Sequence, residues 1–262
     1  MMKKDYNRIK GALYGLAIGD ALGNGATSSP TALAIDVAMG ILALPVFPTG
    51  EIGRRFKEDY RNNKDKLGQV TKMDIENSFA YYWEDAAEIA KKKTPGGTAG
   101  SGALERSLYP GLYYNDKIEA LLHATDIAEM THRDEISTIV VQNYTAAIYD
   151  AIRGKNPFET FIVGLYNPEA KPTGYVIDNY SIAINALGEA DSFDDVIRIV
   201  AEIADPKERS SIGAIAGSLA GAWYGAEAIP EEYIRRLSLK TKEDVTLYML
   251  KLMAAEAAEN TK

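Results

Sequence analysis

The feature that most constrains the fold is a run of glycines spaced four residues apart near the C-terminus. The stretch 210–225 has glycine at positions 213, 217, 221 and 225, with mostly alanine, serine and larger apolar residues between them. In a helix, residues four apart lie on one face, and each interior glycine costs about 1 kcal/mol in propensity relative to alanine. A second backbone packed closely against that face would offset this cost. We therefore predict a buried central helix over 212–225 in a soluble, all-helical domain.

This stretch does not suit a membrane span. The apolar run is about sixteen residues long, whereas a bilayer needs about 20. Glu208, Arg209 and Glu227 flank the run. We therefore expect no membrane partner.

A second glycine stripe lies near the N-terminus. Gly11, Gly15 and Gly19 repeat the same spacing inside a predicted helix over 6–22. Two such faces can pack closely against each other, or each against a third helix. Asp20 lies near the end of this helix, where the helix dipole disfavours a negative charge. It is either a solvated end residue or an acid that faces a site.

Composition narrows the function classes. The 262 residues suffice for one large core or at most two domains, and no stretch resembles a second domain, so we predict a single domain over 1–262. The net charge of −8 argues against nucleic acid as a partner. With no cysteine and two histidines, disulfides, thiolate nucleophiles and multi-histidine metal sites are excluded. The N-terminus is a poor signal peptide, so we expect a cytoplasmic protein. No feature indicates an oligomeric state.

Apolar periodicity and capping residues predict most of the remaining helices. The predicted ranges are 31–43, 73–93, 117–129, 134–153, 157–168, 176–188, 193–204, 230–238 and 242–259. Residues 49–72 are expected to be mostly exposed helix or loop. The glycine-rich stretch 94–102 is either a cradle of backbone N–H groups for a phosphate or a plain linker. His132, near a helix start, is expected to be a cap or surface residue.

Several stretches, taken together, resemble the ADP-ribosylglycohydrolase family. The stretches that carry the resemblance are RIKGALYGLAIGDALG (8–23), THRD (131–134) with the helix after it, GYVID (174–178), and then 192–204, 212–225 and 229–232. They follow the order of the family and span nearly the whole chain. The resemblance implies a single, orthogonal multi-helix domain with a buried Gly/Ala-rich central helix. It also implies hydrolysis of ADP-ribosyl glycosidic bonds with two magnesium ions.

The metal motifs of the family are degraded in this sequence. Its Thr-Asp-Asp and Asp-x-Asp-Thr motifs fall on Ser28, Ser29 and Pro30, with Thr31 next, and on Glu208, Arg209, Ser210 and Ser211. Magnesium depends on carboxylate oxygens, and most of these carboxylates are gone. We therefore predict no tight dinuclear magnesium site and no other metal or cofactor. The Asn-Gly pair in the middle loop of the family falls on Ser101 and Gly102.

Three functions remain open. The leading one is a pseudoenzyme that binds an ADP-ribose-like ligand or an ADP-ribosylated protein, because two-metal catalysis needs the missing carboxylates. The second is an active hydrolase with an altered, metal-free site, in which Asp20, Glu208 and Asp178 do the acid–base work. The third is a structural or assembly protein. The candidate catalytic residues are Asp20 and Glu208, and the candidate ligand-binding residues are Ser28, Ser29, Thr31, Ser101, Gly102, Ser210 and Ser211.

One aromatic cluster is also open to two interpretations. Tyr109, Tyr113 and Tyr114 lie close together in the sequence. They either stack against an adenine or pack in the core.

Overall fold

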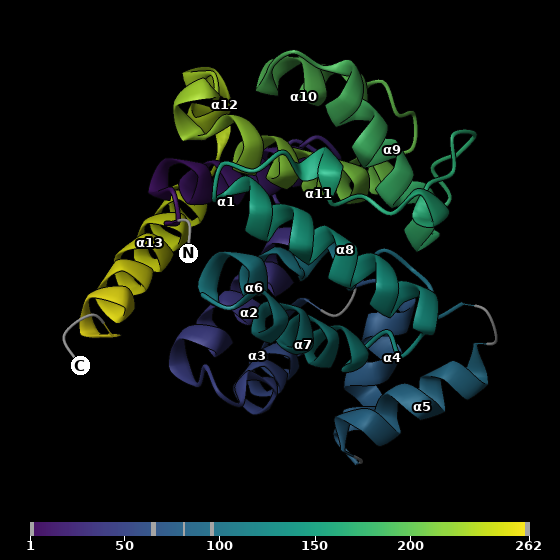
Figure 1. Cartoon of the computed structure of the whole chain (residues 1–262). Coiled ribbons are helices and arrows are strands. Elements are labelled where there is room, and N and C mark those ends of the chain that lie inside the picture. The colour runs from purple at the N-terminus through teal and green to yellow at the C-terminus, as the bar shows by residue number, and fades with distance from the viewer. Residues whose placement is uncertain (1–2, 64–66, 81, 95–96, 260–262) are drawn as a thin grey trace.

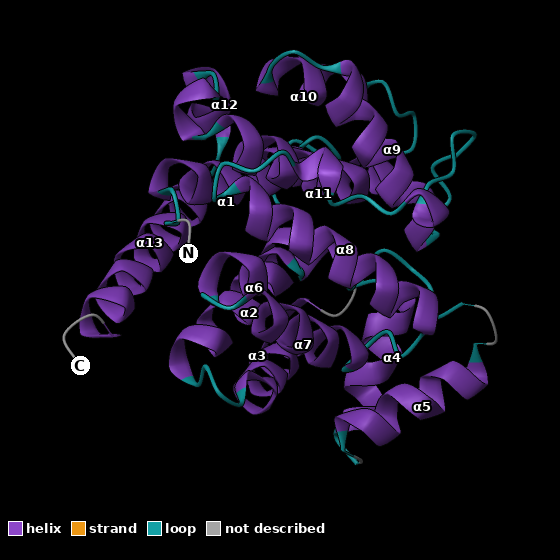
Figure 2. Cartoon of the chain, viewed as in Figure 1, coloured by secondary structure: helices purple, strands orange, loops and turns teal. Residues whose placement is uncertain are grey.

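The computed structural model of the chain describes residues 3–63, 67–80, 82–94 and 97–259. Within these residues the regular structure is helical, as the sequence predicts, and the β-type pairing is limited to an isolated bridge between Gly100 and Tyr175 (Figures 1 and 2). Tyr81 of the predicted helix 73–93, and Pro95 and Gly96 of the glycine-rich stretch, lie outside the described residues.

The helices follow one another along the chain. The first seven α-helices are α1 (Tyr6–Ala21), α2 (Ser29–Ala43), α3 (Pro48–Asn63), α4 (Gln69–Ser78), α5 (Trp83–Lys93), α6 (Leu108–Tyr113) and α7 (Lys117–Glu129). The rest are α8 (Glu135–Ala151), α9 (Val176–Glu189), α10 (Phe193–Ala201), α11 (Pro206–Tyr224), α12 (Glu231–Arg236) and α13 (Leu239–Glu259). Short 3-10 turns are η2 (Leu104–Arg106), η3 (Pro157–Glu159), η4 (Val163–Leu165) and η5 (Ala226–Ala228).

The two glycine stripes pack against each other, which settles the question that the sequence leaves open. Gly11 faces Gly221, Gly15 faces Gly217, and Gly19 faces Gly213, so that α1 and α11 cross the centre of the molecule in backbone contact. A Cβ atom at any of these six positions would overlap a carbonyl oxygen of the opposite helix. The predicted buried central helix is confirmed: its described residues from Ser210 to Ala222 are all buried.

The other helices surround this pair. Helices α8, α9 and α10 pack on α11, while α2 contacts both α1 and α3. One cluster of buried side chains runs from Ile9 in α1 to Leu252 in α13. Among the described residues, no helix is both long enough and apolar enough to cross a bilayer.

The structure corrects the prediction for residues 49–72. Helix α3 is amphipathic rather than mostly exposed, and it buries Ile52 and Phe56 completely. Gly40 of α2 allows this packing, because a Cβ there would overlap the Ile52 side chain. Because α3 has few apolar residues, its buried face could not be predicted from the periodicity of the sequence.

Two predicted helices are also wrong in extent. The helix expected over 73–93 is divided into α4 and α5, and the interruption lets Phe79 pack on Tyr60 and Trp83 pack on Phe56, with ring centroids 6.0 and 6.3 Å apart. The range 157–168 forms only the 3-10 turns η3 and η4. That range is rich in β-branched residues and contains Gly164, and both features disfavour a continuous helix.

Candidate functional site

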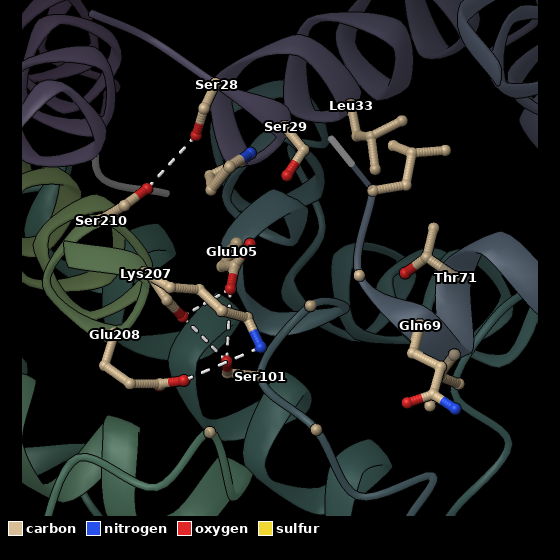
Figure 3. A pocket seen from close by; sticks show the side chains of 18 of the residues that line it. Ser28, Ser29, Leu33, Gln69, Thr71, Ser101, Glu105, Lys207, Glu208 and Ser210 are labelled. Atoms are coloured by element: carbon tan, nitrogen blue, oxygen red, sulfur yellow. Dashed lines mark hydrogen bonds and ion pairs between the residues drawn. The ribbon is translucent and has the colours of Figure 1, made fainter. Parts of the chain in front are cut away.

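A polar pocket of about 530 Å³ opens beside the N-termini of α2 and α11 (Figure 3). Five further segments complete its wall: Asn24, residues 67–71, residues 97–106, His132, and Thr173 with Gly174. In the close-up, Leu33, Gln69 and Thr71 lie on one side, and Glu208, Ser210 and Lys207 of α11 lie on the other. The volume is in the range typical of small-molecule sites.

The pocket brings together most of the residues that the sequence singles out. Seven of the candidate residues line it: Ser28, Ser29, Ser101, Gly102, Glu208, Ser210 and Ser211. Asp20 and Thr31 are buried behind that lining. Whether any of these residues binds a ligand or acts in catalysis stays a prediction.

Asp20 organises the floor of the pocket. Its side chain is fully buried, so the interpretation as a solvated end residue is wrong. Oδ1 accepts hydrogen bonds from the hydroxyls of Ser28 and Ser210, each at 2.6 Å. Oδ2 accepts from the backbone N–H of Ser28 at 2.6 Å, and from the N–H and hydroxyl of Thr31 at 3.1 and 2.6 Å. The carboxylate thereby joins the end of α1 to the beginnings of α2 and α11.

A second polar group lies where residues 101–105, α9 and α11 meet. We call Ser101, Glu105, Asn179, Glu208 and Ser211 the Glu105–Glu208 cluster. Nδ2 of Asn179 donates to Oε2 of Glu208 at 2.9 Å and to the hydroxyl of Ser101 at 3.1 Å. The hydroxyls of Ser101 and Ser211 lie 2.8 Å apart, and both reach Oε1 of Glu105.

Gly174 makes room for this cluster. It has a φ of +81°, which favours glycine, and a Cβ there would lie 3.2 Å from Oε1 of Glu208. Lys207 is mostly exposed, and its Nζ lies 3.9 Å from the same oxygen. The pocket therefore places an exposed ammonium group beside the carboxyl group of Glu208.

His132 is buried against the pocket, so its prediction as a cap or surface residue is wrong. Its Nδ1 lies 3.0 Å from the hydroxyl of Thr131, and burial lowers its pKa to about 3. The imidazole is therefore neutral at pH 7. Gly102 lets the ring approach the loop, since a Cβ there would lie 3.1 Å from Cε1 of His132.

Several other residues that drew attention in the sequence lie away from the pocket. Asp178 accepts from Asn167 and Thr173, each at 2.9 Å, and does not line the pocket. Arg209 turns its guanidinium toward the carbonyls of Ile203 and Gly23. The tyrosines pack: Tyr109 lies against Tyr248, and Tyr113 and Tyr114 lie edge to face.

Sequence reasoning missed three charged residues of the pocket, namely Glu105, Arg106 and Lys207. Glu105 follows Ser101 by four residues, the spacing that brings side chains together over one helical turn, so a signal was present. Arg106 is buried and donates to Thr131 and to the carbonyl of Gly102. Arg106 offers no such signal, because its partners come together only in the folded chain.

The residues present do not fit a pair of magnesium ions. The hydroxyls of Ser28 and Ser210 are already engaged with Asp20, and every hydrogen bond to Asp20 fills an oxygen lone pair that a cation would need. Among the described residues, no three His, Cys, Asp or Glu side chains gather as metal ligands would. We therefore derive no chemical step through a metal.

A buried acid near the pocket makes stability depend on pH. Asp74 of α4 is fully buried, and among the described residues neither of its carboxyl oxygens has a hydrogen-bond partner. Burial raises its pKa to about 8, although Arg106 opposes the shift. The unfolded value is about 3.9, so between about pH 4 and 8 the folded state binds more protons, and stability falls as pH rises.

We expect Asp74→Asn to flatten this dependence. One group contributes at most about 1.4 kcal/mol per pH unit, and the variant should lose most of that slope. Urea unfolding across the range would measure it. Asp126→Asn, on the exposed face of α7, should keep the wild-type slope. Identical slopes for wild type and Asp74→Asn would contradict the prediction.

The fold and the pocket define a class of protein: an all-helical protein with a hydroxyl- and carboxyl-lined pocket at the N-terminus of its central glycine-rich helix. The sequence model of the family described as ADP-ribosylglycohydrolase matches residues 1–261, so the chain belongs to the ADP-ribosylglycohydrolase family.

Individual relatives are distant. The chain is 22% identical over 285 residues to the ADP-ribosylarginine hydrolase Tri1 of Pseudomonas putida (strain GB-1), covering 88% of this chain and 74% of that protein. It is 23% identical to the Tri1 protein of Serratia proteamaculans (strain 568), covering 88% and 75%. A solved structure described as an ADP-ribosylglycohydrolase-related protein complex has a TM-score of 0.79 and 24% identity over 95% of this chain and 98% of its own. That structure supports the fold.

Proposed function

We propose that the chain binds an ADP-ribosyl group in this pocket without a dinuclear magnesium site. With respect to the metal-dependent reaction of its family, it is a pseudoenzyme. The observation that carries the proposal is the polar pocket itself, whose wall contains the positions of both family metal motifs but presents there serine hydroxyls, Pro30 and a single carboxyl group, that of Glu208.

The lining suits a polar, anionic ligand with one flat apolar part. Hydroxyl and amide groups of Ser28, Ser29, Gln69 and Thr71 can bind ribose hydroxyls, and the ammonium of Lys207 can bind a phosphate. Leu33 and Leu67 also line the pocket and offer an apolar surface to a base. The ligand is either free or attached to a modified protein. We propose a cytoplasmic site of action.

The test is calorimetry with ADP-ribose, in excess EDTA and in magnesium. We expect saturable binding with the same affinity in both, and no tight magnesium binding by the protein alone. Ser29→Trp should abolish ADP-ribose binding by filling the pocket, because Ser29 lines the pocket at the beginning of α2. Ser29→Ala, at the same position, should bind as wild type does.

Two results would overturn the proposal. One is an absence of ADP-ribose binding, which would favour a structural or assembly role for the helical scaffold. The other is binding that requires two equivalents of magnesium. One observation favours a second function, hydrolysis without metal: two carboxyl groups share the pocket.

A further inference from the structure

Glu105 is a carboxyl group that the proposed binding function does not use. It lies on η2 and lines the pocket, where it is partly exposed. Its Oε1 accepts hydrogen bonds from the hydroxyls of Ser101 and Ser211. Among the described residues none bonds to its Oε2, which leaves that oxygen available to a molecule in the pocket.

The environment of Glu105 favours its protonated form. Burial raises its pKa to about 7, and Asp20 acts in the same direction. Arg106 and the two serine hydroxyls oppose the shift. Because the hydroxyls bring their hydrogens to Oε1, the proton of the neutral form belongs on Oε2. At neutral pH a large fraction of the protein therefore holds an acidic proton at the pocket wall.

Glu208 belongs to the same cluster but has different partners. Asn179 donates to its Oε2 at 2.9 Å, and the ammonium of Lys207 lies 3.9 Å from its Oε1. An amide donor and a cation are partners of a carboxylate. One pocket thus holds a carboxyl group arranged to give a proton and a second arranged to take one, and such a division of roles between two carboxyls allows acid–base catalysis.

We propose that Glu105 and Glu208 catalyse metal-free hydrolysis of an ADP-ribosyl bond whose leaving atom is oxygen. Glu105 donates the proton on Oε2 to that oxygen as the bond from the anomeric carbon breaks, and the bonding electron pair leaves with the oxygen. Glu208 takes a proton from a water molecule whose oxygen bonds to the anomeric carbon. The products are free ADP-ribose and an alcohol; Glu208 then releases its proton to solvent, and Glu105 takes one up from solvent. The substrate class rests on the proposed function.

We infer that the leaving atom is oxygen because an oxygen leaving group needs a proton donor and a guanidine leaving group does not. An ADP-ribosylated guanidinium already carries its proton and departs as a neutral guanidine. A hydroxyl-linked group would depart as an alkoxide, which is a strong base, unless an acid protonates it in the transition state. A neutral carboxyl therefore assists a serine-type linkage far more than an arginine linkage.

The titration of Glu105 gives the reaction a predicted pH dependence. The acid form is lost as pH rises through about 7, so the rate should fall above that pH. The charged or titratable groups around Glu105 are Arg106 on its own turn, Asp20 from α1, Tyr144 from α8, and Glu208 and Lys207 from α11. Burial raises the pKa of Tyr144 well above the neutral range, so Tyr144 does not titrate with Glu105.

The experiment measures ADP-ribose release from serine-linked and arginine-linked peptides in EDTA. Wild type should release ADP-ribose slowly from the serine-linked peptide, and faster at pH 6 than at pH 8 because Glu105 loses its proton over that range. Glu105→Gln, which keeps an acceptor for both serines, should lower kcat by about 10²–10⁴-fold and remove the fall above pH 7. Its calorimetric affinity for ADP-ribose should stay close to that of wild type. Glu202→Gln, on the exposed end of α10, should leave rate and profile unchanged.

The outcomes separate this inference from the proposed function. Binding of ADP-ribose with no release from either peptide overturns the inference and leaves the binding function intact. If the protein neither binds ADP-ribose nor releases it from either peptide, both the inference and the proposed binding function are overturned. Release that chelation abolishes, an unchanged kcat in Glu105→Gln, or a preference for the arginine-linked peptide also overturns the inference.

Discussion

Gly217→Leu should reduce the free energy of unfolding by more than about 3 kcal/mol, the upper end of the range usual for overpacking. Position 217 faces the Gly15 carbonyl across the α1–α11 contact, and even a Cβ there would overlap the carbonyl oxygen. The obstacle is backbone rather than a flexible side chain, and neighbouring pairs at Gly11 and Gly19 hold both helices at the same separation. Neither helix can move away without breaking those contacts.

Urea unfolding followed by circular dichroism would measure this loss. The matched control is Gly50→Leu, because Gly50 is also helical but is exposed, with nothing within 4 Å of a Cβ. That variant should change stability by no more than about 1 kcal/mol, and in the stabilising direction, since leucine has the higher helix propensity. If both variants lost a similar amount of unfolding free energy, the close α1–α11 contact would not be the reason that position 217 needs glycine.

Asp20→Ala is expected to have a comparable effect for a different reason. The substitution leaves five donors from Ser28, Thr31 and Ser210 without their acceptor in the interior. Hydrogen bonds to a charged group contribute about 1.5–3 kcal/mol each and are not additive. We therefore expect a loss of about 3–5 kcal/mol in the free energy of unfolding, together with weaker binding of ADP-ribose.

The control for this variant is Asp126→Ala, which removes an exposed acid from α7. It should change stability by no more than about 0.5 kcal/mol. If Asp20→Ala kept wild-type stability but lost only hydrolysis, Asp20 would be a catalytic residue rather than the centre of the pocket floor.

The fold could be predicted where close helix packing requires a recognisable residue pattern in the sequence. Glycine every fourth residue indicates a helix face in backbone contact, and the stripes at 11–19 and 213–221 lie against each other. Capping residues helped to locate other helices, and in the structure Asp116 caps α7 and Ser192 caps α10. The prediction failed for α3, because Ile52 and Phe56 are two apolar residues in an otherwise polar helix and only the docked partner shows their burial.

The pocket could be predicted only in part. Hydroxyl residues near helix starts, such as Ser28 and Ser210, were found because the family resemblance marks their positions. Glu105 and Lys207 were missed, since the role of each depends on neighbours that are distant in sequence. The burial of His132 was missed for the same reason, because the loop that covers it begins some thirty residues earlier.

The glycine contact also sets the order in which the chain can assemble. Gly15 and its partner Gly217 are separated by about 200 residues, which at a synthesis rate of about 5–20 residues per second means roughly 10–40 s on the ribosome. Until α11 has been synthesised, the glycine face of α1 lacks the helix that it packs against in the folded chain. Because the pocket lies at the ends of both helices, its walls come together only when α11 has emerged and docked. The binding proposed for this pocket is thus among the last properties that the growing chain would acquire, and a chain truncated before α11 would lack it.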